Sequence, residues 1–410
     1  MKIVQINMCS DGSTGKIMFQ IAETARKHGH EAKTFSTHQF SVKYKKLPPA
    51  PQDHRYFGTY LENAIHYVFG SRVGFNGCWS FFSTIRLISE LKKIKPDIIH
   101  LHNLHGFCIN LPLLFSYIKK YKVKTVWTLH DCWAFTGHCP HFDMIGCEKW
   151  KSGCFDCPQH TAYPKCRADR SAFMWKKKRK WFSGVPELVL VTPSEWLAGL
   201  VKDSFLKEYP VKVINNGIDL SVFRPVGSNF RSENGLNDKF VVLGVAFGWS
   251  NRKGLDVFIE LSERLDDRYK IVLVGVDEKI QALLPDNILT VRRTQNRTQL
   301  AEIYSAADLF VNPTREENYP GVNMEALACG TPVLTFETGG STEIADDTCG
   351  CSVKKDNIDE LEFQIKRICE KKPYSAENCF ERAKSFDMKD RYKEYIDLYE
   401  ETADDRASEN

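Results

Sequence analysis

The sequence predicts an α/β protein with two doubly wound parallel sheets, each covered by helices on both faces. Short β-rich runs alternate with amphipathic stretches, which is typical of βαβ units. The alternation occurs twice, on either side of a connector rich in Gly, Pro and Asn that follows residue 215. A chain of 410 residues also exceeds the roughly 250–300 residues at which a single core stops growing. We therefore expect an N-terminal domain over 1–220, a C-terminal domain over 221–385, and a helix over 386–410 that packs back on the N-terminal domain.

The first series of elements reads as strands joined by crossover helices. The expected strands are Lys2–Met8, Ala32–Thr37, Pro96–His102, Val123–His130 and Leu188–Pro193, and the connector follows Val211–Asn215. The expected helices are Lys16–His28, with Ile17, Ile21 and Ala25 at helical spacing, and Trp79–Lys93, which repeats the pattern with Phe82, Ile85, Ile88 and Leu91.

The second series follows the same plan. Its expected strands are Phe240–Val245, Lys270–Val274, Ile288–Val291, Leu309–Asn312 and Pro332–Phe336, with helices that begin near Gly254, Thr298 and Gly321. A charged helical tail runs from Ile358 to about Thr402 and places Tyr392, Tyr395, Ile396 and Tyr399 on one face, which needs a packing partner. Ligands of doubly wound sheets bind outside the carboxyl ends of the strands, so we expect a central cleft between the domains to hold the active site.

Composition and charge restrict the class of protein. The chain is 42% hydrophobic and 26% charged, as in globular proteins, and a net charge of +4 gives no argument for nucleic acid as a partner. The first residues lack the apolar core of a signal peptide, and no stretch approaches 18 uninterrupted apolar residues. We expect a cytoplasmic protein whose fourteen cysteines are reduced thiols or metal ligands.

Two features of the first domain suggest chemistry. The loop CSDGSTGK contains Gly12 and Gly15 directly before a helix, where backbone N–H groups can approach an anion, although an ordinary tight turn reads the same way. It matches neither a dinucleotide fingerprint nor a P-loop. His130 closes a strand that reads as central, so it is our preferred candidate over a histidine that merely packs.

Two features of the second domain suit a sugar nucleotide. Arg252 and Lys253 end one strand and open a helix, which directs two cations at one spot and fits a diphosphate; a solvated basic turn is the alternative. Glu317 and Glu325 flank a loop-to-helix signal at Pro320-Gly321. Carboxylates accept two hydrogen bonds from a vicinal diol, so this pair suits a sugar and a ribose.

Together these pieces resemble glycosyltransferase family 4, a group of retaining enzymes with the GT-B fold, of the kind that acts in bacterial surface-polysaccharide biosynthesis. The segment AEIYSAADLFVNPTREENYPGVNMEALACGTPVLTFETGG is similar to the family's donor-binding region almost throughout. The glycine loop, DIIHLHNLHG, WTLHD, VTPSEWLA and VINNGID extend the resemblance in order over roughly residues 1 to 370.

The resemblance implies a metal-independent hexosyltransferase that uses a UDP- or GDP-linked sugar and a saccharide or lipid-linked acceptor. Glu317 would bind the donor sugar, Glu325 the ribose, and Arg252 with Lys253 the diphosphate. His130 would contact the transferred sugar near its anomeric centre, and the Gly12–Gly15 loop would approach the phosphates and the acceptor. The remaining donor-binding positions that the resemblance implies are Arg293, Asn318, Tyr319 and Gly321.

One departure from the family pattern affects the phosphate site. Many members carry a further arginine shortly before the lysine, where this chain has Val245-Ala246-Phe247. Neutralisation then depends on Arg252, Lys253 and the helix N-terminus, or on Arg293. Two other functions stay open: a nucleotide-sugar 2-epimerase, and a non-catalytic protein that binds nucleotide sugars.

An insertion over residues 131–170 holds six of the fourteen cysteines. Cys139, Cys147, Cys154 and Cys157 include one CxxC and are candidate ligands of a structural zinc ion. The alternatives are reduced thiols in a compact loop, or a disulfide if the compartment is oxidising.

A basic run follows the insertion. Trp175–Phe182 reads WKKKRKWF, five cations flanked by aromatic residues. This pattern suits a peripheral contact with the inner, anionic face of a membrane, and equally a solvated helix face.

Overall fold

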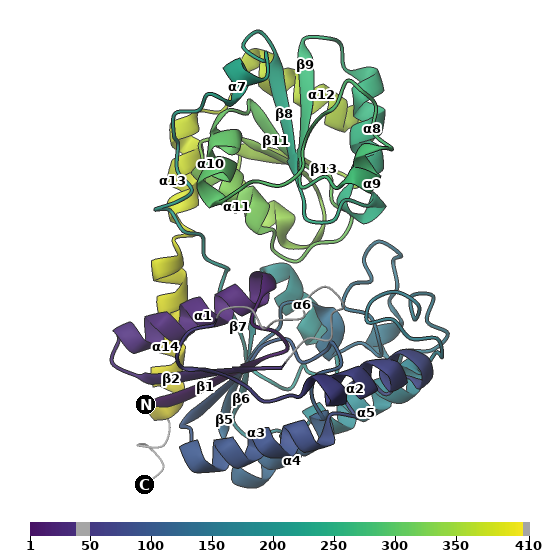
Figure 1. Cartoon of the computed structure of the whole chain (residues 1–410), viewed down its shortest axis with the longest axis vertical. Helices are drawn as coiled ribbons and strands as arrows, with labels where there is room; N and C mark the ends of the chain where they lie inside the picture. Colours follow the sequence, from purple (N-terminus) through teal and green to yellow (C-terminus); the bar gives the residue numbers. More distant parts are fainter. Residues whose placement is uncertain (38–49, 405–410) are drawn as a thin grey trace. The chain divides into compact units, whose positions relative to one another are not determined.

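The chain forms two compact units, each built around one sheet (Figure 1). The computed structural model describes residues 1–37 and 50–404. Unit 1 contains Met1–Phe142, Gly146–Ile214 and the C-terminal segment from Arg391; unit 2 contains Asn215–Asp390 and the short segment Asp143–Ile145. Both sheets are parallel throughout and carry helices on both faces, which confirms the predicted fold class.

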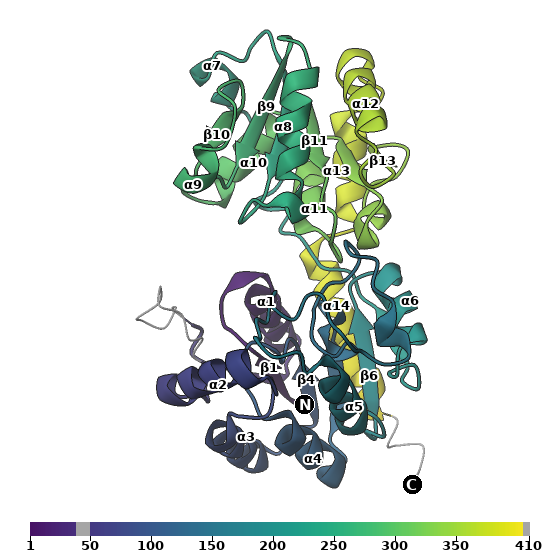
Figure 2. The same cartoon turned by 90° about the vertical axis from the view of Figure 1, so that its right-hand side faces the viewer.

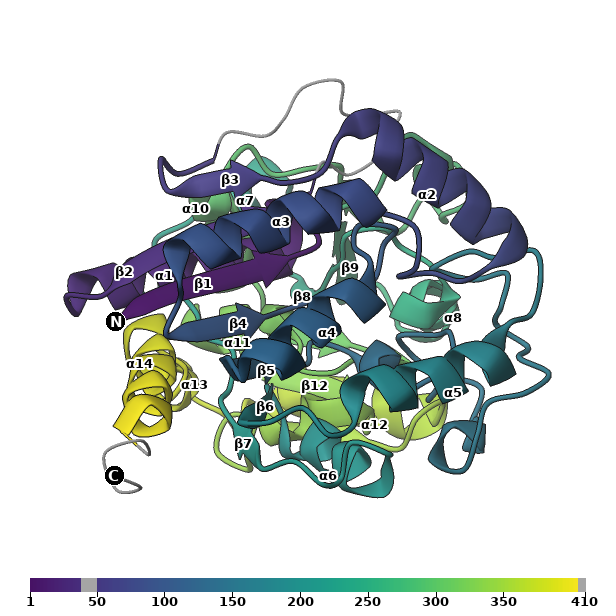
Figure 3. The ribbon, with the colours of Figure 1, turned by 90° about the horizontal axis from the view of Figure 1, so that it is seen from below.

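Unit 1 has a seven-stranded sheet in the order β3-β2-β1-β4-β5-β6-β7, whose strands Figure 3 shows from below. The strands are β1 (Lys2–Asn7), β2 (Glu31–Ser36), β3 (His54–Tyr56), β4 (Ile98–Leu101), β5 (Lys124–Thr128), β6 (Leu188–Thr192) and β7 (Val211–Val213). The helices are α1 (Gly12–Lys27), α2 (Tyr60–Val73), α3 (Phe81–Ile94), α4 (Leu111–Tyr121), α5 (Ser171–Phe182), α6 (Glu195–Asp203) and α14 (Met388–Asp404).

Unit 2 has a six-stranded sheet in the order β10-β9-β8-β11-β12-β13. The strands are β8 (Phe240–Val245), β9 (Tyr269–Val274), β10 (Leu289–Val291), β11 (Leu309–Asn312), β12 (Val333–Phe336) and β13 (Gly350–Val353). The helices are α7 (Phe230–Glu233), α8 (Leu255–Arg264), α9 (Glu278–Gln281), α10 (Arg297–Ser305), α11 (Gly321–Ala328), α12 (Ile358–Lys371) and α13 (Ala376–Lys384).

Unit 2 contains two hydrophobic cores, one on each face of its sheet. Helices α8 and α12 pack on one face, and helices α10, α11 and α13 lie on the other. Successive residues of a strand alternate between the cores, as Val241 and Val242 of β8 do. Both faces of the sheet are therefore buried, and the strands read as continuous apolar runs.

Helix α14 supplies a buried row of side chains to unit 1. Tyr399 OH lies 2.6 Å from His100 Nδ1, and Thr128 Oγ1 donates to Tyr395 OH over 3.2 Å. Buried Lys124 donates to the main-chain carbonyls of Thr402 and Ala403, where a helix carries partial negative charge. The tyrosine face of the tail thus packs on residues of β4 and β5.

A strand is present at each position where one was expected, and the edge strands β3 and β13 were not predicted. Helix α2 was missed because its buried positions are Asn63, His66 and Gly70, so no apolar 3.6-residue pattern marks its inner face. The prediction of which side of the helix over 79–93 is buried is wrong for its first turns. Phe82 and Ile85 are exposed, whereas the polar Ser83 and Thr84 are buried.

Among the described residues, we find no helix whose length and hydrophobicity would suffice to cross a bilayer.

Buried neutral histidines make the stability of unit 1 depend on pH. His66 is fully buried, lies 2.6 Å from Ser80 Oγ through Nδ1, and accepts at Nε2 from Gly77 N–H over 3.2 Å. Burial lowers the pKa of His66 to about 3 and the pKa of His54 to about 4. In the unfolded chain histidine has a pKa of about 6.5.

We predict that the free energy of unfolding falls as the pH is lowered from 7 to 5. As the pH falls, the histidines of the unfolded chain take up protons before those of the folded chain do. The stabilisation is therefore complete above about pH 6.5. Below that pH each histidine reduces the free energy of unfolding by about 1.4 kcal/mol per pH unit until its folded pKa is reached. Urea denaturation at each pH measures it. His66→Gln should show a shallower decline than wild type, and His28→Gln, at an exposed position, the same decline. Equal stability at pH 7 and 5 would contradict the assignment.

Candidate active site

The glycine loop of unit 1 lies directly after β1, at the start of α1. Asn7 Nδ2 donates to Cys9 O over 3.0 Å and to Thr14 Oγ1 over 3.1 Å, so the loop folds tightly over the end of the strand. At Gly15, a Cβ atom would lie 2.6 Å from the carbonyl carbon of Ser10. A side chain at position 15 would therefore push the first turn of α1, which begins at Gly12, away from the loop.

A row of histidines lies beside this loop, because β1, β4 and β5 are neighbours in the sheet. His102 follows β4 and His130 follows β5; His102 Nδ1 is 3.1 Å from His130 Nε2, and His102 Nε2 is 2.9 Å from the amide of Gln5. Every hydrogen bond of the Gln5 amide is formed when its nitrogen donates to His102 Nε2 and Met18 O and its oxygen accepts from Ala22 N–H. His102 then donates through Nδ1.

That orientation fixes the protonation of His130. Its Nε2 accepts the bond from His102, so a neutral His130 carries its proton on Nδ1. Burial lowers the pKa of His130 to about 4, despite the opposing effect of Asp131, and burial also lowers the pKa of His102. Both side chains are neutral at pH 7, and His130 is a partly exposed hydrogen-bond donor rather than a cation.

A hydrogen-bonded pair of His105 and Asp131 completes the cluster in unit 1. His105 Nε2 lies 2.8 Å from Asp131 Oδ2, and His105 Nδ1 lies 3.0 Å from the Tyr163 hydroxyl. Burial alone would raise the pKa of Asp131, but His105 and the N–H of Trp133 lower it to about 2. Tyr163 belongs to the cysteine-rich insertion and contacts the site, a role that its sequence context did not signal.

In unit 2 the predicted cations and one glutamate meet at adjacent strands. Arg252 and Lys253 follow β8, Glu317 follows β11, and these strands are paired. Lys253 Nζ forms an ion pair with Glu317 Oε2, and Arg252 Nη1 donates to the main-chain carbonyl of Glu316 over 3.2 Å. The predicted cations and Glu317 therefore lie together in the structure.

The second glutamate lies on α11. Tyr304 OH donates to Glu325 Oε2 over 3.1 Å. Burial and the carboxylate raise the pKa of Tyr304, which keeps its hydroxyl protonated. The loop before this helix contains the buried residues Asn318 and Tyr319, and Gly321 begins the helix.

Arg293 lies apart from these residues. It is exposed, and it follows β10 at the edge of the sheet, with β9 between that strand and β8. The structure thus brings together Arg252, Lys253 and Glu317 but not Arg293.

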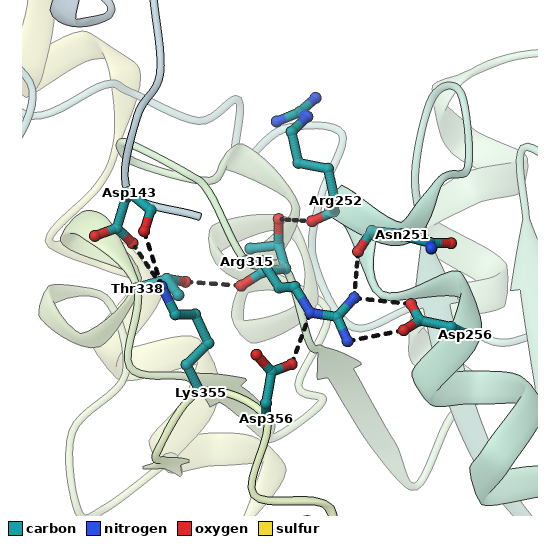
Figure 4. Close-up of polar contacts among 9 residues, drawn as sticks. Asp143, Asn251, Arg252, Asp256, Arg315, Thr338, Lys355 and Asp356 are labelled. Atoms are coloured by element: carbon teal, nitrogen blue, oxygen red, sulfur yellow. Dashed lines mark hydrogen bonds and ion pairs between the residues drawn. The ribbon is translucent and has the colours of Figure 1, made fainter. Parts of the chain in front are cut away.

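Arg315, which was not predicted as a site residue, holds the turn Asn251–Gly254 that carries Arg252 and Lys253 (Figure 4). Its guanidinium forms two bonds of 2.8 Å to the Asp256 carboxylate and one of 2.6 Å to Asp356 Oδ1, and it donates to the main-chain carbonyl of Asn251. Its own N–H donates to Arg252 O over 2.9 Å. The sequence held a signal for Arg315, because this cation stands only two residues before the predicted site residue Glu317.

The turn is further fixed from both sides. Thr314 Oγ1 donates to Arg252 O over 3.2 Å, and Thr338 Oγ1 donates to Thr314 O over 2.9 Å. Gly254 ends the turn with φ +75°, and a Cβ atom there would lie 2.4 Å from Pro313 O. The loops after β8 and β11 therefore pack against each other through main-chain contacts.

The cysteine insertion does not form the expected zinc site. All fourteen cysteines are free thiols, and within the described residues, which include the whole insertion, no group of three or more His, Cys, Asp or Glu has the arrangement of a metal site. A hydrogen bond from Cys139 lowers the pKa of Cys157, and Gly137 N–H donates to Cys154 Sγ over 3.1 Å. Cys139 is buried and Cys147 half-buried in the compact loop, which matches the alternative of reduced thiols.

Comparison with known families finds matches over both units. Residues 14–222 match the family model described as Glycosyltransferase Family 4, and residues 238–371 match the model described as Glycosyl transferases group 1.

Two curated relatives have similar sequences. The putative colanic acid biosynthesis glycosyl transferase WcaC of Escherichia coli (strain K12) is 28% identical over 278 residues, which cover 65% of this chain and 66% of that protein. D-inositol 3-phosphate glycosyltransferase of Mycobacteroides abscessus is 32% identical over 157 residues, 35% of each chain. The chain thus spans 66% of the first relative's length and 35% of the second's.

Solved structures share the fold over nearly the whole chain. Sucrose-phosphate synthase from Thermosynechococcus elongatus has a TM-score of 0.70 at 18% identity and covers 98% of both chains. Anabaena HepE in complex with UDP-glucose has a TM-score of 0.66 at 15% identity, with coverage of 98% of this chain and 100% of that one.

We predict that Arg315→Ala lowers the free energy of unfolding of unit 2 by about 1–3 kcal/mol, because Asp256 and Asp356 lose their partner while both stay partly hydrated. The measurement is chemical denaturation. Arg264→Ala is the matched control: its ion pairs with Glu260, Asp359 and Glu362 lie at the surface, where water screens them, so we expect a clearly smaller loss. Equal losses in the two variants would show that Arg315 is an ordinary surface residue.

Proposed function

The chain belongs to glycosyltransferase family 4 and has the GT-B fold, and from this we propose that it is a retaining, metal-independent enzyme of polysaccharide biosynthesis. It transfers the hexose of a nucleotide-diphosphate sugar to a saccharide or a lipid-linked saccharide. Two relatives support the donor and the process: a protein of the same fold was solved in complex with UDP-glucose, and a sequence relative is named for colanic acid biosynthesis.

The observation that carries the proposal is the meeting of Lys253 and Glu317, with Arg252 beside them, at the carboxyl ends of β8 and β11. When the glycosidic bond breaks, the diphosphate gains charge and the sugar becomes oxocarbenium-like. Fixed cations stabilise that charge in the place where a metal ion would otherwise act. A carboxylate next to them accepts hydrogen bonds from the sugar hydroxyls.

We assign the ribose of the donor to Glu325. A carboxylate offers about four acceptor positions, so the bond from Tyr304 is compatible with two more from a ribose diol. Because Tyr304 stays protonated, it holds this carboxylate in one orientation.

In unit 1 we assign His130 to the transferred sugar and the Gly12–Gly15 loop to the phosphates and the acceptor. A neutral His130 with its proton on Nδ1 can donate a hydrogen bond without adding positive charge beside a developing oxocarbenium ion. Attack by the acceptor on the face from which the diphosphate leaves retains the configuration and requires no protein nucleophile.

We also propose a peripheral contact of α5 with the anionic inner face of a membrane, which would suit a lipid-linked acceptor. Trp175, Lys178 and Phe182 are buried and Trp181 is half-buried, so the run Trp175–Phe182 offers mainly its other cations to this contact. Lys178 instead donates to the main-chain carbonyls of Trp133 and Thr136, which anchors the insertion.

The activity is tested with a panel of UDP- and GDP-linked sugars in the presence of EDTA. The true donor should raise the melting temperature, since a ligand of the folded state stabilises it, and turnover should require an acceptor. The anomeric configuration of the product, read by NMR, tests retention. Epimerisation of the nucleotide sugar without an acceptor, or binding without any turnover, would replace the proposal by one of its two alternatives.

We predict that Glu317→Gln lowers kcat by about 10²-fold or more, because it removes a carboxylate that contacts the reacting sugar, and changes the Kd for the free nucleotide by less than about fivefold. Steady-state kinetics and calorimetry measure the two effects. Glu337→Gln, at an exposed position of unit 2, is the control and should match wild type. A parallel loss of turnover and nucleotide binding would refute the role of Glu317.

A further inference from the structure

Helix α2 has an inverted distribution of side chains. It buries Asn63, His66 and Gly70, whereas Leu61 and Ile65 are exposed, Leu61 by 69%. A helix on the surface of a globular protein normally turns its apolar stripe inwards. The stripe opposite the buried residues consists of Leu61, Ile65, Val68 and Arg72, which follow one another at intervals of four, three and four residues. Phe69 and Val73 lie beside this stripe.

The orientation of α2 is fixed by its polar inner face. Asn63 Nδ2 donates to Thr37 Oγ1 over 3.0 Å, and His66 is hydrogen-bonded to Ser80 and Gly77. At Gly70 a Cβ atom would lie 2.6 Å from the ring of Phe107. Rotation of the helix would break these buried bonds and force a clash, so its apolar side stays exposed.

The start of α3 extends this exposed surface. Phe81, Phe82 and Ile85 are exposed, Phe82 by 70%. Glu62 of α2 accepts hydrogen bonds from the Ser83 N–H, over 2.9 Å, and from its hydroxyl, which joins the first turns of the two helices. We call the following set the α2–α3 surface: Tyr60, Leu61, Ile65, Val68, Phe69, Val73, Phe81, Phe82 and Ile85. Both helices lie on the outside of unit 1 (Figures 2 and 3).

Cations border one end of the α2–α3 surface. Arg72 is exposed on the apolar stripe itself. The Arg170 guanidinium lies 5.5 Å from the centre of the Phe75 ring, and Lys177 Nζ lies 5.0 Å from that of Phe173; these two rings are 5.1 Å apart.

The same end carries two further cations. Exposed Arg167 donates its main-chain N–H to Ser71 O over 2.8 Å, and exposed Lys176 precedes Lys177. An exposed acid, Asp169, also lies in this region, and its carboxylate accepts hydrogen bonds from the N–H groups of Cys157 and Ser171.

We propose that unit 1 docks on an anionic lipid bilayer through the α2–α3 surface, with Arg72, Arg167, Arg170, Lys176 and Lys177 at the lipid phosphates. Aliphatic and phenylalanine side chains on a helix that lies in the interface enter the acyl region, while neighbouring cations pair with headgroups. This positive border favours an anionic bilayer over an uncharged protein surface. The inference rests on the peripheral contact proposed for α5 and assigns its apolar part to residues outside that helix.

The test is co-sedimentation of the full chain with vesicles of phosphatidylglycerol and phosphatidylcholine, and with vesicles of phosphatidylcholine alone. We expect wild type to bind the anionic vesicles and the variant Leu61→Gln/Ile65→Gln/Phe82→Gln to lose about tenfold or more of its vesicle partitioning. The three side chains are exposed, so the melting temperature should not fall. Leu283→Gln/Phe363→Gln, at comparably exposed apolar positions of unit 2, is the matched control and should bind like wild type.

Three outcomes would overturn the inference. The first is wild type that does not bind anionic vesicles. The second is a triple variant that binds like wild type while Lys176→Glu/Lys177→Glu does not, which would leave a purely electrostatic contact of α5. The third is self-association of wild type, measured by sedimentation and lost in the triple variant, which would assign the surface to a second copy. Transfer to a soluble acceptor, measured in parallel, reports separately on the proposed activity.

Discussion

Parallel pairing of neighbouring strands is the constraint on which both clusters of candidate site residues depend. In a parallel sheet all carboxyl ends lie at one edge, so loops far apart in sequence become neighbours when their strands pair. The order β1-β4-β5 brings the glycine loop, His102 and His130 together, and the pairing of β8 with β11 brings Lys253 to Glu317. The strands themselves are ordinary apolar runs, buried on both faces.

Pairing places these loops side by side, but buried hydrogen bonds fix the orientation of their side chains. Gln5 determines which nitrogen of His102 donates, and through it where His130 carries its proton. In unit 2, Arg315 joins both loops through main-chain and carboxylate contacts. Such networks have few alternative arrangements, because a buried polar group that loses its partner is costly.

The same rule explains the outer surface of unit 1. The polar residues of α2 and α3 face inwards because each finds a partner there, as Asn63 does with Thr37 and Ser83 with Glu62. Their apolar residues are then left outside. A buried polar face and an exposed apolar face are thus two consequences of one set of hydrogen bonds, and they give unit 1 a surface suited to a lipid bilayer.

The sequence by itself determined the two parallel sheets and most strand positions, since apolar runs and glycine turns are local signals, whereas the roles of the site residues stay predictions. It missed Arg315 and Tyr163, whose partners are distant in the chain, and it misjudged Phe82 and Ile85, because periodicity shows that a helix has an apolar side but not which side is buried. It also suggested a zinc site from cysteine spacing that the fold does not assemble. Tertiary structure decided these points, because each depends on which groups from distant segments meet, and that is settled by packing and by satisfying buried polar atoms.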